Sequence, residues 1–157
     1  MSQSMEQGRQ WLLSALAWLA GPVEWLVRLY LAKVFFFSGW VKWQDWESTL
    51  YLFRYEYRVP WLPPEWAAWL ATASELLLPV LLVLGLGTRL AAGGLWILNL
   101  VAVIAYYHVL KTSPAALQDH LQWGLLLSLL LVRVPAAWGL DHWLARRRAP
   151  KLPAGSR

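Results

Sequence analysis

The sequence predicts an all-α integral membrane protein: a four-helix bundle with an N-terminal amphipathic helix and a short external helix between the first and second spans. Two observations predict this class. Hydrophobic residues make up 59% of the 157-residue chain and charged residues only 15%, whereas a soluble domain carries about 25% charged residues. Four stretches are also long and apolar enough to cross a bilayer, which takes about 20 residues.

The rest of the composition narrows the chemistry. Thirteen tryptophans suit a chain that meets lipid, because amphipathic indoles favour the membrane–water interface. The absence of cysteine excludes thiol–disulfide exchange, thiolate metal ligation and cysteine-bound iron–sulfur clusters. Much of the net charge of +5 comes from a basic C-terminal tail at 144–157, which indicates a cytoplasmic anchor and not a nucleic-acid surface.

The four spans are expected within one domain of residues 1–157, at about 22–42, 64–86, 88–110 and 117–135. Gly21-Pro22 opens the first span, because proline is tolerated in a first helical turn. The turn at 85–87 joins spans two and three as an antiparallel hairpin. The apolar run at 9–20 is too short to cross, which favours an interfacial or bundle-packed helix over a cleaved signal peptide.

The longest connection between spans carries a helix of its own. In the stretch "DWESTLYLFRYEY" the apolar side chains recur every three or four residues, at Trp46, Leu50, Phe53 and Tyr57. This spacing predicts an amphipathic helix that lies in the membrane interface or caps the bundle. Val59-Pro60 ends the helix, and Pro63-Pro64 begins the next span.

The distribution of lysine and arginine predicts the orientation. Arg89 lies in the tight turn between spans two and three, and the basic tail follows span four. Positive charge in short loops marks the cytoplasmic side. We therefore expect a multi-pass protein of a bacterial inner membrane, with both termini cytoplasmic and the connection at 43–63 facing the periplasm.

Three polar residues lie roughly 15 Å deep by the helical rise, near the bilayer midplane: Lys33, Glu75 and Asn99. The matched depths predict a buried ion pair between Lys33 and Glu75, with Arg28 as the alternative partner. Glu75 is interpreted either as a proton carrier or ligand for a lipid-soluble substrate, or as part of a structural ion pair. The structural interpretation is favoured for Lys33, because lysine can snorkel, and for Asn99.

A second polar cluster is expected at the external side, where span three ends and span four begins. It contains two histidines and a carboxylate among aromatic side chains, with the lysine from span one: Lys42, Tyr106, Tyr107, His108, Asp119, His120 and Trp123. Histidine and carboxylate are ordinary metal ligands, but no HxxxH or HExxH spacing occurs, so no metal site is predicted. The favoured alternative is a quinone-type site in which His120 donates a hydrogen bond to a carbonyl.

Three blocks of this sequence resemble the DoxX family of bacterial membrane proteins. They are "RLYLAKVFFFSGWVK", the long block "LFRYEYRVPWLPPEWAAWLATASELLLPVLLVLGLGTRLAA" and "HLQWGLLLSLLL", and they cover most of 28–131. The resemblance places several residues on recurrent polar positions of the family: Arg28, Ser38, Gly39, Lys42, Glu75, Arg89 and His120. At the C-terminal end the chain keeps Gly139-Leu140-Asp141 but lacks the family's glycine turn.

The resemblance implies a four-helix membrane bundle and several kinds of partner. Some relatives look like subunits of a thiosulfate:quinone oxidoreductase, and others work with oxidative-stress or thiol-redox proteins. A further group accompanies proteins that handle copper or iron peptides in the bacterial envelope, and the block "EYRVPWLPPEWAA" is similar to that group.

The sequence therefore favours a redox-linked subunit that binds a quinone or a similar lipid-soluble molecule and works with a partner protein or as a homo-oligomer. We expect Glu75 and His120 to take part in the chemistry and the ligand to be bound by Arg28, Lys33, Lys42, Glu75, Tyr106, His120 and Trp123. One alternative is a non-catalytic scaffold or accessory protein of an envelope metal-handling or oxidative-stress complex, docked through 43–63. A weaker one is a small transporter or metal-delivery protein.

Overall fold

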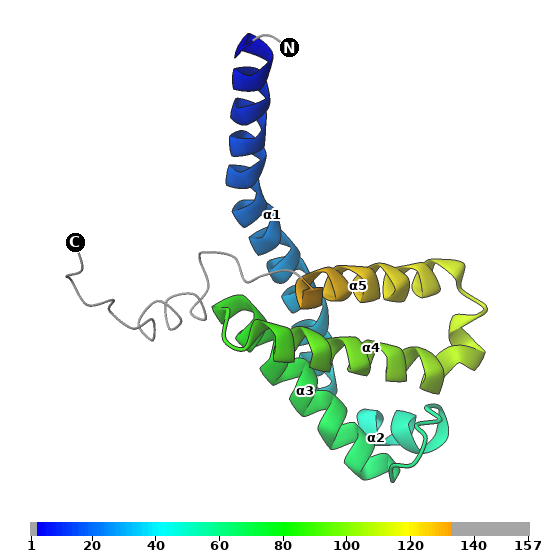
Figure 1. Cartoon of the computed structure of the whole chain (residues 1–157). Coiled ribbons are helices and arrows are strands. Elements are labelled where there is room, and N and C mark those ends of the chain that lie inside the picture. The colour runs from blue at the N-terminus through cyan, green and yellow to red at the C-terminus, as the bar shows by residue number, and fades with distance from the viewer. Residues whose placement is uncertain (1–2, 133–157) are drawn as a thin grey trace, which may run out of the picture.

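The computed structural model describes residues 3–132, which form five α-helices and no strand (Figure 1). The helices are α1 (Gln3–Gln44), α2 (Trp46–Tyr55), α3 (Pro64–Leu84), α4 (Thr88–Leu110) and α5 (Pro114–Val132). All but α2 are long and apolar enough to cross a membrane. The all-α class and the four spanning helices are thus confirmed. The expected end of span four at 133–135, the Gly139-Leu140-Asp141 segment and the basic tail lie outside the described residues.

α1 differs from the expectation of a separate N-terminal helix followed by a span. It runs without a break through Gly21 and Pro22. A proline inside a helix removes one hydrogen bond and crowds the carbonyl four residues earlier. The flanking alanine- and leucine-rich turns have high helix propensity, so this one lost bond does not end the helix.

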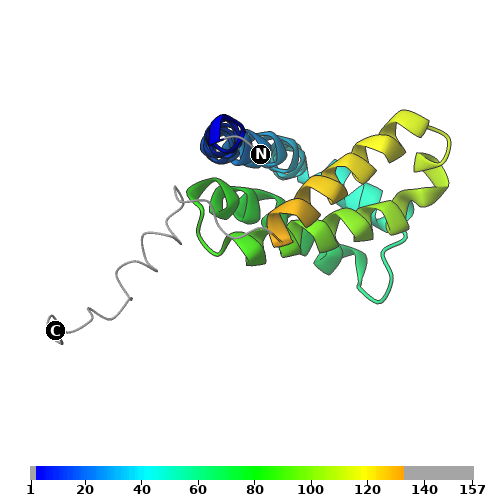
Figure 2. The same cartoon turned by 45° about the horizontal axis from the view of Figure 1, so that its top comes forward.

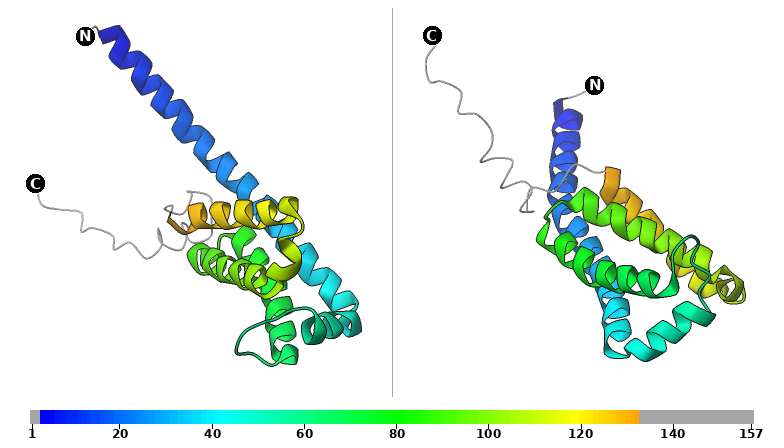
Figure 3. Two further views of the ribbon diagram at one scale, coloured as in Figure 1. Left: turned by 90° about the vertical axis from the view of Figure 1, so that its right-hand side faces the viewer. Right: turned by 90° about the horizontal axis from the view of Figure 1, so that it is seen from below.

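The two halves of α1 have different surroundings. The first half projects beyond the other helices (Figure 3), and its large apolar side chains are exposed, among them Trp11 and Trp18. From Glu24 onward one face of α1 is buried against α3 and α5. Only this second half belongs to the bundle.

The remaining spans form two consecutive antiparallel hairpins. Gly85 caps the end of α3 and Gly87 caps the start of α4, both with left-handed backbone, at φ 66° and 55°. Glycine adopts this conformation without a steric cost, which makes so short a reversal feasible. α4 and α5 then lie side by side, as the two views in Figures 1 and 2 agree. The hairpin expected at 85–87 is present.

α2 is the expected external helix. Asp45 caps its N-terminus by accepting a hydrogen bond from the Ser48 backbone N–H at 3.0 Å. Its apolar face packs on the start of α3, where Phe53 meets Ala67 and Ala68. α2 therefore covers one end of the bundle, opposite the α3–α4 turn (Figure 1).

The apolar core occupies the half of the bundle nearer the α3–α4 turn. Its buried members come from all four spanning helices: Leu31, Phe35, Leu82, Ala91, Ala92, Leu95, Leu127 and Leu130. Because lipid is as apolar as leucine, close packing rather than transfer out of water stabilises this half. The other half, under α2, is not filled in the same way, and the candidate site lies there.

Candidate functional site

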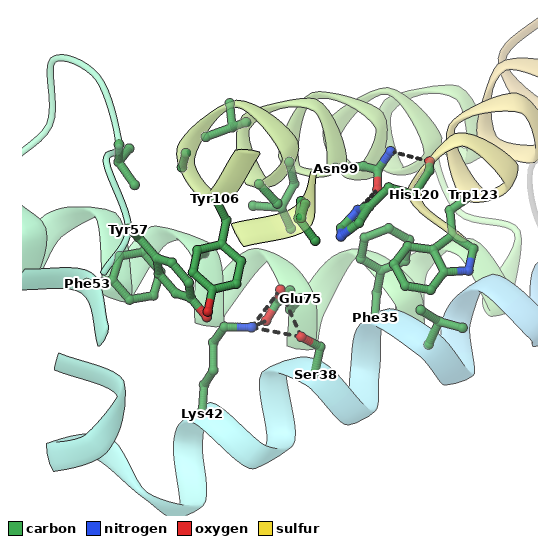
Figure 4. Close-up of a pocket in the computed structure, with 18 residues that line it drawn as sticks. Phe35, Ser38, Lys42, Phe53, Tyr57, Glu75, Asn99, Tyr106, His120 and Trp123 are labelled. Atoms are coloured by element: carbon green, nitrogen blue, oxygen red, sulfur yellow. Dashed lines mark hydrogen bonds and ion pairs between the residues drawn. The ribbon is translucent and has the colours of Figure 1, made fainter. Parts of the chain in front are cut away.

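A cavity of about 260 Å³ lies between the four spanning helices at the α2 end (Figure 4). Its wall is mostly apolar and aromatic. The polar side chains that reach it come from every spanning helix and from the segment after α2: Ser38, Lys42, Tyr57, Glu75, Asn99, Tyr106, His120 and Trp123. An apolar pocket with a few convergent polar groups is the usual form of a ligand site.

One side of the cavity is an ion pair between α1 and α3. The Lys42 ammonium lies 2.7 and 2.9 Å from the two carboxylate oxygens of Glu75. Ser38, one helical turn before Lys42, donates to Glu75 at 3.2 Å and accepts from Lys42 at 2.8 Å. Every member of the group has a charged partner, as groups at membrane depth require. Glu75 is thus held by two α1 side chains.

The expected partners of Glu75 are elsewhere. Lys33 and Lys42 are nine residues apart, which is about two and a half helical turns, so they lie on opposite faces of α1. Lys33 accordingly lines a separate groove on the outside of the bundle. The predicted Lys33–Glu75 pair does not form, because Lys33 lies on the opposite face of α1 and about one helical turn nearer the α3–α4 turn, level with Pro79 and Val80.

Arg28 is also remote from the cavity. It is 2% exposed and forms a short ion pair with Glu24, one turn earlier on α1. It also donates to the Leu82 carbonyl and to the Thr88 hydroxyl, both at 3.2 Å. These contacts join α1 to both sides of the α3–α4 turn. Arg28 therefore stabilises the end of the bundle opposite the cavity.

The contact between α1 and α3 at the ion pair depends on Gly39. A Cβ atom at this position would lie 2.7 Å from the Glu75 Cβ and 3.1 Å from its backbone carbon. Contacts below 3.0 Å require a shift of one helix. Gly39 therefore permits the backbones to approach closely, as small residues do in membrane helix packing.

His120 and Asn99 form the opposite side of the cavity. The Asn99 amide nitrogen donates to the His120 backbone carbonyl at 2.9 Å, and its oxygen lies 2.8 Å from His120 Nδ1. The backbone carbonyl can only accept, so the Asn99 nitrogen must face it and the Asn99 oxygen must face the His120 ring. Because that oxygen can also only accept, Nδ1 of His120 must carry the hydrogen. In the neutral ring, Nε2 is then an acceptor, and it points away from Asn99 into the cavity (Figure 4).

This tautomer changes the role expected for His120. A neutral His120 accepts a hydrogen bond through Nε2, so it suits a hydroxyl group; it donates to a carbonyl only when protonated. Gly124 makes room for the arrangement, because a Cβ there would lie 3.3 Å from the Asn99 amide nitrogen. Asn99 was expected only to bond one helix to another. Its bonds from α4 to His120 on α5 also fix the tautomer of the His120 ring.

Aromatic rings connect the two polar sides. Trp123 packs edge-on against Phe35 and His120, and its indole N–H donates to the Tyr30 hydroxyl at 3.2 Å. Trp123 therefore offers its ring, and not its N–H group, to the cavity. His120 lies three residues before Trp123 on α5, and residues at this spacing are neighbours on one face of a helix.

Two tyrosines close the α2 end of the cavity. Tyr57 and Tyr106 meet edge-to-face with ring centroids 4.9 Å apart. The Arg58 N–H fixes the segment by donating to the Ala105 carbonyl at 2.9 Å. Burial, and then the nearby Tyr106, raises the pKa of Tyr57 above its usual value of 10.0, so this hydroxyl is neutral at physiological pH. The sequence indicated Tyr57 only as part of the α2 stripe.

The other polar residues of the expected cluster do not reach the cavity wall. His108 packs against Tyr106 with ring centroids 5.5 Å apart, and Asp119 is exposed. Within residues 3–132 no three histidine or acidic side chains converge as a metal site would require. Of the residues expected to bind the ligand, the structure thus gathers Lys42, Glu75, Tyr106, His120 and Trp123, and places Arg28 and Lys33 elsewhere.

Comparison with known proteins identifies the family. No curated protein and no solved structure matches the chain. The sequence pattern of the DoxX family matches residues 23–108, which comprise the bundled half of α1, α2, α3 and nearly all of α4. The matched segment includes Lys42 and Glu75, whereas His120 lies beyond it. Because the match covers more than half of the chain, this multi-pass membrane protein belongs to the DoxX family.

Proposed function

We propose that the protein is a redox-linked subunit of the bacterial inner membrane that binds a quinone between its helices. In this proposal both termini are cytoplasmic and α2 faces the periplasm. The observation that carries the proposal is the cavity with polar groups on two sides and aromatic rings between them. A flat ring with an oxygen at each end matches this distribution.

The size of the cavity supports a ring-shaped head group with an apolar tail. Ligand pockets usually measure roughly 300–1,000 Å³, and the cavity, at about 260 Å³, is slightly smaller than this range. A second, apolar pocket of about 190 Å³ lies between α3 and α4 and shares wall residues with it, including Phe53, Ala71 and Leu98. Exposed Leu70 and Ile97 border this pocket on the lipid side. A tail would lie there while the head group occupies the cavity.

The chain offers proton-carrying groups to such a ligand. Interconversion of a quinone and its quinol moves two electrons and two protons. Neutral His120 has the tautomer to accept a proton from a quinol hydroxyl, and Lys42 with Glu75 forms a second proton-carrying group on the other side. The chain has no cysteine to exchange electrons, so a partner protein would supply or accept them.

Ligand binding is measured on the detergent-purified protein by extracting its lipids and by titrating it with a short-tailed quinone while following tryptophan fluorescence. We expect quenching, because Trp123 lines the cavity. Glu75→Gln and His120→Leu should each weaken binding about tenfold or more, because each substitution removes a hydrogen bond that involves a charged or polar partner. Glu65→Gln is the control, because Glu65 is half-exposed and pairs with Arg54. Absence of both bound quinone and quenching would refute the proposal.

A second candidate function is a scaffold for an envelope complex. The observation that favours it is Trp61 in the α2–α3 connection, which is 98% exposed and has a left-handed backbone at φ 61°. Such a conformation is unusual outside glycine and is found at functional sites. If Trp61→Ala removes a co-purifying protein from native membranes while Glu75→Gln leaves complex and cellular function intact, the scaffold accounts for the protein and the quinone does not.

A further inference from the structure

We propose that a groove on the lipid-facing side of α1 and α3 binds one anionic phospholipid, with Lys33 holding its phosphate. The groove has a volume of about 320 Å³. Its wall is apolar apart from Lys33 and includes Phe36, Phe37, Pro79, Val80 and Leu84. None of these residues lines the quinone cavity, so the two sites are separate.

Lys33 brings a positive charge that the described part of the chain does not neutralise. It is exposed, and within residues 3–132 it has no hydrogen-bond or ion-pair partner. The nearest carboxylates on α1 and α3 are already paired, Glu24 with Arg28 and Glu75 with Lys42. A cation in an apolar, membrane-embedded groove is costly, and an anion in contact with it reduces this cost.

The depth of Lys33 matches a lipid head group. The groove extends along α3 from Pro79 to Leu84, the last residue of the helix. Val80 lies about 6 Å before that end by the helical rise. A lysine side chain of roughly that length can extend its ammonium to the membrane surface while its methylene groups remain on apolar surface. The phosphate would therefore lie at the α3–α4 turn, with an acyl chain along Phe36 and Phe37.

A second copy of the chain fits this groove less well than a lipid does. It would need a free carboxylate at the depth of Lys33. Among the described residues, the acidic side chains without an ion pair or a capping role are Glu47, Glu56 and Asp119, and all lie toward the α2 end of the molecule. A phospholipid supplies an anion at the required depth and a tail for the groove, so charge and shape both favour it.

Native mass spectrometry of the full-length protein, in micelles that contain phosphatidylglycerol and phosphatidylcholine, tests the proposal. We expect one phosphatidylglycerol to be retained in preference to phosphatidylcholine. Lys33→Met should weaken phosphatidylglycerol retention roughly five- to tenfold, because one basic residue near an anionic lipid surface contributes about that much to binding. It should also abolish the preference for phosphatidylglycerol over phosphatidylcholine. Val80→Trp should fill the groove and lower the retention of both lipids while Lys33 remains in place.

Lys111→Met is the matched control, because it removes one positive charge from an exposed lysine at the opposite end of α4, away from the groove. It should leave the phosphatidylglycerol preference unchanged. Equal losses in Lys111→Met and Lys33→Met would overturn the proposal in favour of diffuse surface attraction. Displacement of the lipid by inorganic phosphate alone, or a Lys33→Met variant that changes the oligomeric state but not the lipid retention, would overturn it as well. Elution and helical content of each variant must match the parent protein.

Discussion

Two buried threonines illustrate how differently one residue type contributes to this fold. The Thr49 hydroxyl donates to the Lys42 carbonyl at 3.1 Å and so attaches α2 to the end of α1. The Thr72 hydroxyl, on α3, is the one fully buried side-chain oxygen within residues 3–132 that has no hydrogen-bond partner. A buried polar group without a partner costs about 1–3 kcal/mol, whereas a satisfied one contributes about 1 kcal/mol.

We therefore predict opposite effects for the same substitution at these two positions. Thr72→Val removes an unsatisfied hydroxyl while keeping the side-chain shape, and should leave the protein as stable or about 1 kcal/mol more stable. Thr49→Val should lower stability by about 1 kcal/mol. Thermal unfolding in detergent, followed by circular dichroism, measures both. Destabilisation by Thr72→Val equal to that by Thr49→Val would contradict the assignment of Thr72 as unsatisfied.

At the scale of elements, the packing of α1 against α3 depends on one glycine. Gly39 lies in close contact with Glu75, and the ion pair from Glu75 to Lys42 forms beside it. Gly8, on the same helix, lies on the exposed half of α1, and a Cβ atom added there would meet no other atom within 4 Å. A glycine-to-alanine substitution at Gly8 therefore changes only helix propensity, whereas the same substitution at Gly39 also changes the packing of α1 on α3.

We predict that Gly39→Ala destabilises the bundle by about 1–3 kcal/mol, because the added carbon forces α1 and α3 apart. If the protein binds a quinone as proposed, this change should also weaken that binding by displacing Glu75. Gly8→Ala should be neutral or slightly stabilising, since alanine favours a helix by roughly 1 kcal/mol over glycine. Unfolding curves and the fluorescence titration test both variants. An unchanged Gly39→Ala protein would show that the helices can separate without cost.

At the scale of the whole molecule, the first half of α1 is an attachment to the bundle and not a part of its core. Its apolar residues Trp11 and Trp18 are 78% and 80% exposed, and burial on α1 begins at Glu24. A segment with so few packed side chains contributes little to the stability of the rest.

Deletion of residues 3–20 should consequently leave the melting temperature of the bundle, and the quinone binding proposed for it, within error of the full chain. The same deletion should weaken any association that uses the exposed apolar helix, whether with lipid or with protein. Melting curves, the quinone titration and detergent-to-protein ratios by light scattering are the measurements. A large loss of melting temperature would mean that this half of α1 packs on the bundle.

Local features determined those parts of the fold that the sequence predicts well. A span is recognised by the length of an apolar run, which is why 88–110 agrees with α4 (Thr88–Leu110) to the residue. Glycines and prolines act on the backbone next to them, so the start of α3 at Pro64 and the turn at Gly85 were also predictable. Pro22 was the exception, because neighbouring turns outweighed its local effect.

Most residues of the candidate site were predictable, but their pairings were not. Depth along the helix brought Glu75 into consideration, and the cluster expected on the external side brought His120 and Trp123; the structure places all three at one cavity. The partner of Glu75 is Lys42 and not Lys33, because each residue turns the helix by about 100°, and depth counting carries no information on rotation.

The sequence by itself therefore determined the class, the spans and the candidate polar residues, which depend on hydrophobicity and on backbone preferences within a few residues. Only the tertiary structure decided which faces meet. The close approach at Gly39 sets the register of α1 on α3, and Asn99 sets the tautomer of His120 from a neighbouring helix. Both depend on contacts between residues distant in the chain, where small differences in rotation select one partner and exclude another.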